Sequence, residues 1–252
     1  MAGRSAFLIL ALLHVGGLAA SAQTGRAAPN LAAIPPSVRA EIDRLASDEP
    51  GQRVTAAESL GQMGGRAVAA LPWLYATLDD GRTVYSLVFG FGRTTMWFVT
   101  ARALAAIGKP AVDFMAKQLS DPRQRPIKGY VLHALGTMLM PEALDLLLTQ
   151  VDTISPMKPA DGSMAQVTSA LGCYILDARV PDALLRLAEA AERTGPSFND
   201  ALRTFDRFFG SAPASDKEFN TVDAARAWWK ANASTAQPNL LARDRDTCPD
   251  TR

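Results

Sequence analysis

The feature that most constrains the fold of this 252-residue chain is an internal repeat. Residues 54–64, VTAAESLGQMG, align with residues 98–108, FVTARALAAIG, after a shift of 44 positions. A shorter form of the pattern returns as HALGTM from His133 and as SALGCY from Ser169. Sequence repeats with periods of roughly 20 to 50 residues are typical of proteins built from stacked copies of one supersecondary unit. The sequence therefore predicts such a unit in about four copies.

Each copy is followed by a second segment with helical periodicity. Apolar residues in both segments recur at steps of three and four, as in Val131, Ala134 and Met138, which places them on one face of a helix. In three of the four copies a proline opens the second segment: Pro110, Pro141 and Pro181. Proline is tolerated at the first helical position because its missing N–H would be unpaired there.

A helix pair of this size cannot bury its apolar face alone, so neighbouring pairs must stack and share a core. The predicted fold class is all-α: an α-solenoid, a single right-handed stack of helix pairs with almost no sheet. One leucine of each copy is expected at an equivalent buried position: Leu60, Leu104, Leu135 and Leu171.

Residues 45–80 carry a more detailed pattern, Arg-x-x-Ala-Ala-x-x-Leu-Gly-x-x-Gly followed by Leu-x-x-x-Leu-x-Asp. This segment resembles the HEAT-like repeats first described in phycobilisome lyases. The matching residues are Arg53, Ala56, Ala57, Leu60, Gly61, Gly64, Leu74, Leu78 and Asp80. The resemblance covers about residues 37–195, with departures at Trp97, which replaces the arginine, and at Leu139, which replaces the second glycine. It implies a HEAT-like fold and a tendency to bind proteins, but not lyase activity, because a fold does not determine a function.

The N-terminal 22 residues have the composition of a secretory signal peptide. Arg4 precedes an apolar run over 6–20, and Ala20-Ser21-Ala22 supplies the small residues that a signal peptidase recognises. A run of this length is shorter than the roughly 20 apolar residues that span a bilayer. The sequence predicts cleavage after Ala22 and export, to the periplasm or the outside of the cell.

The mature chain divides into four further parts. Residues 23–36 are rich in Ala and Pro and are expected to form a linker before the repeats of 37–195. Residues 196–234 hold five of the ten Phe and two of the four Trp, which favours helices that cap the open end of the stack. Residues 235–252 are polar and without period, and a disordered tail is predicted there.

Charge and cysteine content exclude several function classes. The chain has 26 Lys and Arg against 25 Asp and Glu, so it lacks the basic surface of a nucleic-acid-binding protein. The two cysteines, Cys173 and Cys248, form no CxxC pair and have no histidine cluster nearby, so no metal site is expected. Whether they form a disulfide is left open by the sequence.

No catalytic residue and no cofactor is predicted. His133 is the only histidine outside the signal segment, and a lone histidine on a helix is more often structural than catalytic. Ser155 and Lys158 match the Ser-x-x-Lys spacing of serine acyl enzymes but lack the accompanying motifs. Gly90-Phe91-Gly92 lacks the following lysine of a phosphate-binding loop and is interpreted as a turn.

An insertion over residues 81–96 is the main candidate for partner binding. The step between copies is 44 residues from Leu60 to Leu104 but 31 from Leu104 to Leu135, and insertions in repeat proteins often form loops on the binding face. The insertion is apolar, and a short hairpin is possible within it. The candidate contact residues are Tyr85, Phe89, Phe91 and Arg93, together with Trp97. A packing role against the first two repeats is the alternative.

The second helices of a solenoid line its concave side, and they supply further candidates of mixed charge: Asp113, Lys117, Asp145 and Arg186. Mixed charge suits a protein or peptide partner. The predicted function is that of an exported, non-enzymatic scaffold that binds a protein or peptide. Two alternatives remain: an enzyme or enzyme accessory of the bilin-lyase type that holds a small molecule in the groove, and a structural component of the cell envelope.

Overall fold

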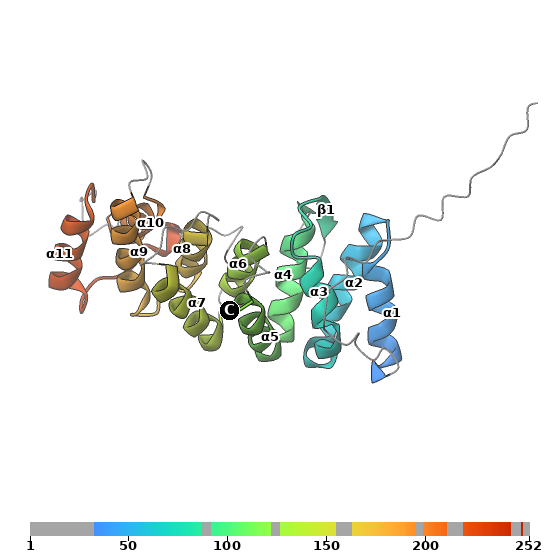
Figure 1. Ribbon diagram of the computed structural model, residues 1–252. Helices are drawn as coiled ribbons and strands as arrows, with labels where there is room; N and C mark the ends of the chain where they lie inside the picture. Colours follow the sequence, from blue (N-terminus) through green and yellow to red (C-terminus); the bar gives the residue numbers. More distant parts are fainter. Residues whose placement is uncertain are drawn as a thin grey trace, which may run out of the picture. The chain divides into compact units, whose positions relative to one another are not determined.

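Helices follow one another in pairs through most of the chain, as the repeat pattern predicts (Figure 1). The computed structural model describes residues 33–86, 92–121, 127–154, 163–194, 199–210, 219–242 and Cys248. The predicted signal peptide and residues 23–32 of the predicted linker lie outside these residues. Residues 34–252 form one unit by their contacts.

The described residues are mostly helical, so the all-α prediction is confirmed. The first helices of the pairs are α2 (Pro50–Met63), α4 (Met96–Ile107), α6 (Lys128–Met138), α8 (Ser163–Cys173) and α10 (Asp200–Phe209). The second members are the 3-10 helix η2 (Gly64–Ala70) with α3 (Leu71–Ala76), then α5 (Lys109–Leu119), α7 (Pro141–Ile154), α9 (Val180–Thr194) and α11 (Val222–Asn232). Helix α1 (Pro36–Leu45) precedes the pairs, and η4 (Leu240–Ala242) follows them.

Contacts between these helices connect each element mainly to its neighbours in the repeat. Helices α2, α4, α6, α8 and α10 contact one another in this order and are here called the first row. Helices α5, α7, α9 and α11 do the same, and with η2 and α3 they are called the second row. Each first-row helix also packs on its own second-row partner. Each inner helix pair is therefore covered by the pairs before and after it in the sequence.

The repeated leucines form the centre of the packing. Leu60, Leu104, Leu135 and Leu171 are all fully buried, each with 0% of its surface exposed. Their predicted equivalence in burial is confirmed. All four belong to one cluster of buried residues that includes members of every helix pair, so the core is continuous along the described helices.

A glycine permits the close approach of α6 and α8. A Cβ atom added at Gly136 would lie 2.8 Å from the Cα and 2.9 Å from the Cβ of Ala170, both closer than real Cβ contacts allow. At Gly172, the equivalent position of the next repeat, an added Cβ would make an ordinary contact of 3.6 Å with the Phe208 ring. The two glycines occupy equivalent positions in the repeat pattern, but only at Gly136 is the absence of a side chain required for the helices to approach.

We expect the Gly136→Ala substitution to lower the free energy of unfolding by about 1 to 3 kcal/mol, since overpacking forces the two helices apart. Gly172→Ala is the matched control and should be neutral or stabilising, because alanine favours the helix over glycine by up to about 1 kcal/mol. Urea denaturation followed by circular dichroism measures both. Equal effects of the two substitutions would contradict the close-packing argument.

The residue that follows each of three first-row helices has a positive φ. Gly64 has φ of 56°, Gly108 has φ of 83°, and Leu139 has φ of 51°. Leucine takes this conformation at a cost of roughly 1 to 2 kcal/mol, whereas glycine takes it freely. Leu139 thus keeps only the positive φ of the two glycines: its ψ is 34°, in the left-handed helical region, whereas Gly64 and Gly108 have ψ of −133° and −145°. Its side chain packs against the core.

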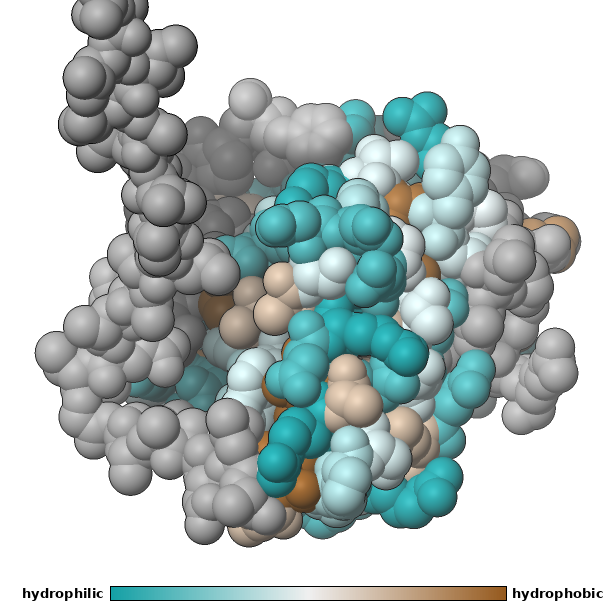
Figure 2. Space-filling model, turned by 90° about the vertical axis from the view of Figure 1, so that its right-hand side faces the viewer, coloured by the Kyte–Doolittle hydropathy of each residue, from teal (hydrophilic) through white to brown (hydrophobic). Residues whose placement is uncertain are grey.

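Helix α1 covers the first pair with an amphipathic face. Val38, Ile42 and Leu45 point inward and are buried, and the side that carries α1 is largely hydrophilic, with hydrophobic atoms only in small patches (Figure 2). None of the described helices is long and apolar enough to cross a lipid bilayer.

Aromatic rings cluster between the C-terminal helices α10 and α11. Phe205 lies 5.0 Å from Phe209 and 5.6 Å from Phe219 between ring centroids, and the ring of Trp229 lies 5.2 Å from that of Phe209. These rings therefore pack α10 and α11, the last helix pair, against each other.

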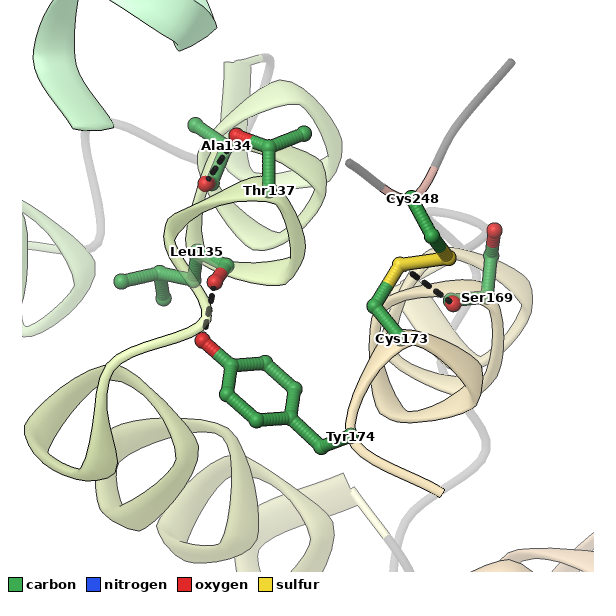
Figure 3. The surroundings of a disulfide bond; sticks show 7 residues. All are labelled: Ala134, Leu135, Thr137, Ser169, Cys173, Tyr174 and Cys248. Carbon is green, nitrogen blue, oxygen red and sulfur yellow. Dashed lines mark hydrogen bonds between the residues drawn. A yellow bond between two sulfur atoms is a disulfide. The ribbon is translucent and has the colours of Figure 1, made fainter. Parts of the chain in front are cut away.

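The tail differs from the predicted disorder where the structure describes it. The backbone N–H of Asn239 donates to the carbonyl oxygen of Phe208 at 2.7 Å, and Cys248 forms a disulfide with Cys173 of α8. In Figure 3, Cys173 points toward Cys248, while the adjacent Tyr174 points to the other side and donates a hydrogen bond to the Leu135 carbonyl at 2.8 Å. The polar composition of the tail does not predict this attachment, because a disulfide can hold a segment in place without burying apolar side chains.

Candidate functional site

The insertion forms an antiparallel hairpin of β1 (Thr83–Ser86) and β2 (Gly92–Thr95), as the sequence allowed. Phe89 and Phe91, two of the predicted contact residues, lie outside the described residues. Strand β1 contacts both α2 and α4, and β2 contacts α4, so the hairpin belongs to the first row of helices.

Alternation along β1 separates a packing face from a solvent face. Val84 is 3% exposed and Ser86 is fully buried, whereas Tyr85 between them is 74% exposed. Ser86 donates a hydrogen bond from its hydroxyl to the Glu58 carboxylate of α2 at 2.5 Å. One face of the insertion therefore packs on the first repeat, and the other faces solvent.

Strand register places Arg93 beside Tyr85. The two residues are paired across the hairpin, so their side chains share its solvent face, and Arg93 is exposed as well. Tyrosine and arginine are the residue types most enriched at the centres of protein interfaces. Tyr85 also has one of the largest exposed fractions among the large hydrophobic residues that the structure describes.

Polar contacts hold the base of the hairpin in place. The guanidinium of Arg82 donates two hydrogen bonds to Asp80, at 2.7 and 2.5 Å, and these bonds keep the pKa of the Asp80 carboxyl below its usual value. Asp80 also lies 3.7 Å from the buried Nε of Arg53. The backbone N–H groups of Met96 and Trp97 donate to the carbonyls of Arg82 and Asp80. The hairpin is thus fixed to the turn of the first repeat.

A pocket of about 400 Å³ lies beside this base. Arg53, Asp80 and Arg82 line it, together with Asp48 and Asp79. Arg53 is 4% exposed and donates from Nη1 to the carbonyl of Ser47 at 2.7 Å. Arg53 and Asp80, the arginine and the aspartate of the repeat pattern, therefore lie side by side. They connect the start of α2 to the turn that follows α3.

Trp97 occupies a different environment from the other predicted contact residues. Its ring lies 4.4 Å from that of His133 in an edge-on arrangement and 6.0 Å from that of Tyr130. These rings are half-buried between α4 and α6. Trp97 and His133 therefore pack against each other in the first row.

The charged candidates lie on the second row. Asp113 and Lys117 belong to α5, Asp145 to α7 and Arg186 to α9, so consecutive contacting helices carry them. The hairpin contacts α2 and α4 of the first row. The hairpin candidates and the charged candidates therefore lie on different rows.

Most of these charges are compensated within the chain. Asp145 accepts a hydrogen bond from Arg179 at 2.7 Å, and Asp113 pairs with Lys109 at 2.8 Å. Arg186 pairs with Asp152 of the neighbouring helix α7 and with Asp182 of its own helix. Lys117 is exposed and forms no ion pair within the described ranges.

The same arrangement continues to α11, where Arg226 pairs with Glu189 and Asp182 of α9. Exposed pairs of this kind contribute only about 0 to 1 kcal/mol each to stability. They leave little uncompensated charge for a partner. The sequence could not show this, because the pairing residues of different helices are 34 or more positions apart.

Sequence reasoning also missed a second pocket, between α8 and α10, which Thr168, Asp200 and Arg207 help to line. The spacing of Asp200 and Arg207 by seven positions placed them on one helix face, but only the packing of α8 against that face shows a cavity there.

No protein-family model matches this sequence, and no curated protein or solved structure is significantly similar to the chain. The groups of three or more His, Cys, Asp or Glu side chains that hold metal ions do not occur among the described residues.

Proposed function

We propose that this protein is an exported, non-enzymatic scaffold of HEAT-like helix pairs, an α-solenoid, which binds a protein or peptide partner through the β1–β2 hairpin. The observation that carries the proposal is the solvent face of the hairpin. Tyr85 is 74% exposed beside Arg93 on a hairpin whose other face is buried on the first repeat.

Neighbour-to-neighbour packing of the two helix rows supports the solenoid. A stack of this kind buries its core through contacts between adjacent repeats and needs caps at both ends. Helix α1 and the aromatic cluster around Phe205 have the composition and burial expected of such caps. The scaffold then presents the hairpin on a base fixed by the Arg82–Asp80 contacts.

A rigid base favours binding. A residue held on an ordered hairpin loses less conformational entropy when a partner binds than the same residue on a flexible loop. Tyr85 supplies a large ring with few rotatable bonds, and Arg93 supplies a planar cation beside it. The compensated charges of the second row would then contribute orientation more than affinity.

Export is supported by the Cys173–Cys248 disulfide, since such bonds persist mainly in oxidising compartments. N-terminal sequencing of the mature protein should begin at Gln23. A mature chain that retains the apolar run of 6–20 would contradict the proposed cleavage.

Site-specific crosslinking tests the binding proposal. A photoreactive phenylalanine analogue in place of Tyr85 should form one discrete adduct with a protein in the native envelope. The matched control carries the same analogue at Leu241, which is 86% exposed and lies on η4. Arg93→Ala should reduce the Tyr85 adduct at least about fivefold, because interface-centre residues typically contribute more than 1 kcal/mol.

Measuring thermal stability distinguishes a binding role of Arg93 from a packing role. Arg93→Ala should leave the thermal midpoint nearly unchanged, as exposed substitutions usually stay within about 0.5 kcal/mol. Equal adducts from positions 85 and 241, or an adduct insensitive to Arg93→Ala, would contradict the proposed role of the hairpin.

A further inference from the structure

A pocket of about 200 Å³ lies between α8 and α10, away from the hairpin. Five polar side chains line it: Thr168, Ser169, Asp200, Thr204 and Arg207. Cys248, held by the disulfide to α8, forms part of its wall. Each polar residue is therefore available to a molecule small enough to enter.

Small residues on α8 leave this space open. Ala165, Ser169 and Gly172 follow one another at steps of four and three, so they lie on one face of the helix, and all three line the pocket. A Cβ at Gly172 would meet Phe208, Thr204 and Arg207 only at 3.6 to 3.9 Å. The packing between α8 and α10 is therefore loose at this face, in contrast to the close approach of α6 and α8.

Thr168 carries a hydroxyl that the fold does not use. The residue is 1% exposed, and its Oγ1 is buried without a hydrogen-bond partner among the described residues. A threonine within a helix commonly donates to a carbonyl of the preceding turn, as Thr137 does to Ala134 at 2.8 Å. Burying an unpaired hydroxyl is unfavourable, and a bound polar molecule would remove that cost.

Asp200 and Arg207 bring opposite charges to the same pocket. They are seven positions apart, two turns along one face of α10. Neither side chain forms an ion pair or a hydrogen bond within the part of the chain that the structure describes, and the Arg207 guanidinium lies 5.2 Å from the centroid of the Phe208 ring. Arg179, Arg186 and Arg226, in contrast, all pair with carboxylates.

We propose that this pocket binds a small zwitterion of the amino-acid class. Its carboxylate binds Arg207, its ammonium group binds Asp200, and Thr168 supplies a hydrogen bond from the wall. The volume corresponds to roughly seven water molecules and is below the range of about 300 to 1,000 Å³ typical of drug-sized ligands. A simple anion would face Asp200, and a simple cation would face Arg207, so a molecule with both charges is favoured.

Titration with a charge-separation series tests the proposal. The probes are glycine, β-alanine and 4-aminobutyrate, with butyrate and butylamine as the single-charge controls. Binding to the full mature chain is followed by methyl NMR of Thr168 and Thr204. We expect at least one zwitterion to bind with a Kd of about 1 mM or lower and at least tenfold more tightly than either single-charge control.

Variants identify the residues responsible. Arg207→Gln and Asp200→Asn should each weaken binding of the best zwitterion at least tenfold, because a charge-assisted hydrogen bond is lost. Thr168→Val should weaken it about fivefold while leaving the melting temperature unchanged or higher, because valine keeps the shape and removes the unpaired hydroxyl. Lys230→Gln, an exposed change on α11 outside the pocket, is the control and should have no effect.

Two results would overturn the proposal. The first is the absence of any zwitterion binding near this affinity while the chain remains folded. The second is equal binding of butyrate and 4-aminobutyrate with no effect of Asp200→Asn, which would make the pocket a simple anion site. A zwitterion that binds normally to a chain whose hairpin carries Arg93→Ala would show that this pocket is independent of the proposed partner site.

Discussion

Replacement of Leu135 by alanine should lower the free energy of unfolding by about 2 to 5 kcal/mol, the range measured for fully buried leucines. Leu135 is 0% exposed, and its backbone carbonyl accepts the hydrogen bond from Tyr174 of the next repeat. The cavity would therefore open at the junction of two helix pairs. Burial raises the pKa of the Tyr174 hydroxyl above its usual value, so this donor stays protonated in mildly alkaline solution as well.

Urea denaturation followed by far-ultraviolet circular dichroism measures this effect. Leu241→Ala is the matched control, because the same atoms are removed from a side chain that is 86% exposed, and a change within about 0.5 kcal/mol is expected there. A neutral Leu135→Ala variant would contradict the continuous core between α6 and α8.

Removal of the Cys173–Cys248 disulfide should also have a large effect. The two cysteines are 75 positions apart, and the loop-entropy model gives about 3 kcal/mol for a loop of 15 residues and about 4.7 kcal/mol for one of 100. The Cys173→Ala/Cys248→Ala variant should therefore unfold at a lower urea concentration, with a loss of about 3 to 5 kcal/mol.

Reduction of the unaltered protein provides an independent comparison. Both cysteines are at least 95% buried, so their reduction should be slow in the native state and rapid in urea. The alanine variant should be insensitive to the reductant. Alkylation of either cysteine in the native protein without a reductant would contradict the bond.

The sequence indicated which residues could form the candidate site, but not how they are arranged. The aromatic and arginine content of 81–96 indicated an interface, and a hairpin was possible, but the sequence did not separate binding from packing. Strand register shows which residues belong to which face: Val84 and Ser86 turn inward, and Tyr85 and Arg93 turn outward. A shift of one residue would have exchanged the two faces, which is why local composition could not decide between them.

The sequence by itself determined the helical class, the order of the helix pairs and the burial of the repeated leucines, because these depend on residue periods within single helices. Three features were decided only by the tertiary structure: the pairing of arginines with carboxylates across the second row, the attachment of the tail through Cys248, and the pocket beside Thr168. Each of them joins residues that are more than 30 positions apart. Such residues come together only when the helices pack. The distances between packed helices, unlike the spacing of apolar residues within one helix, cannot be derived from the sequence of any single segment.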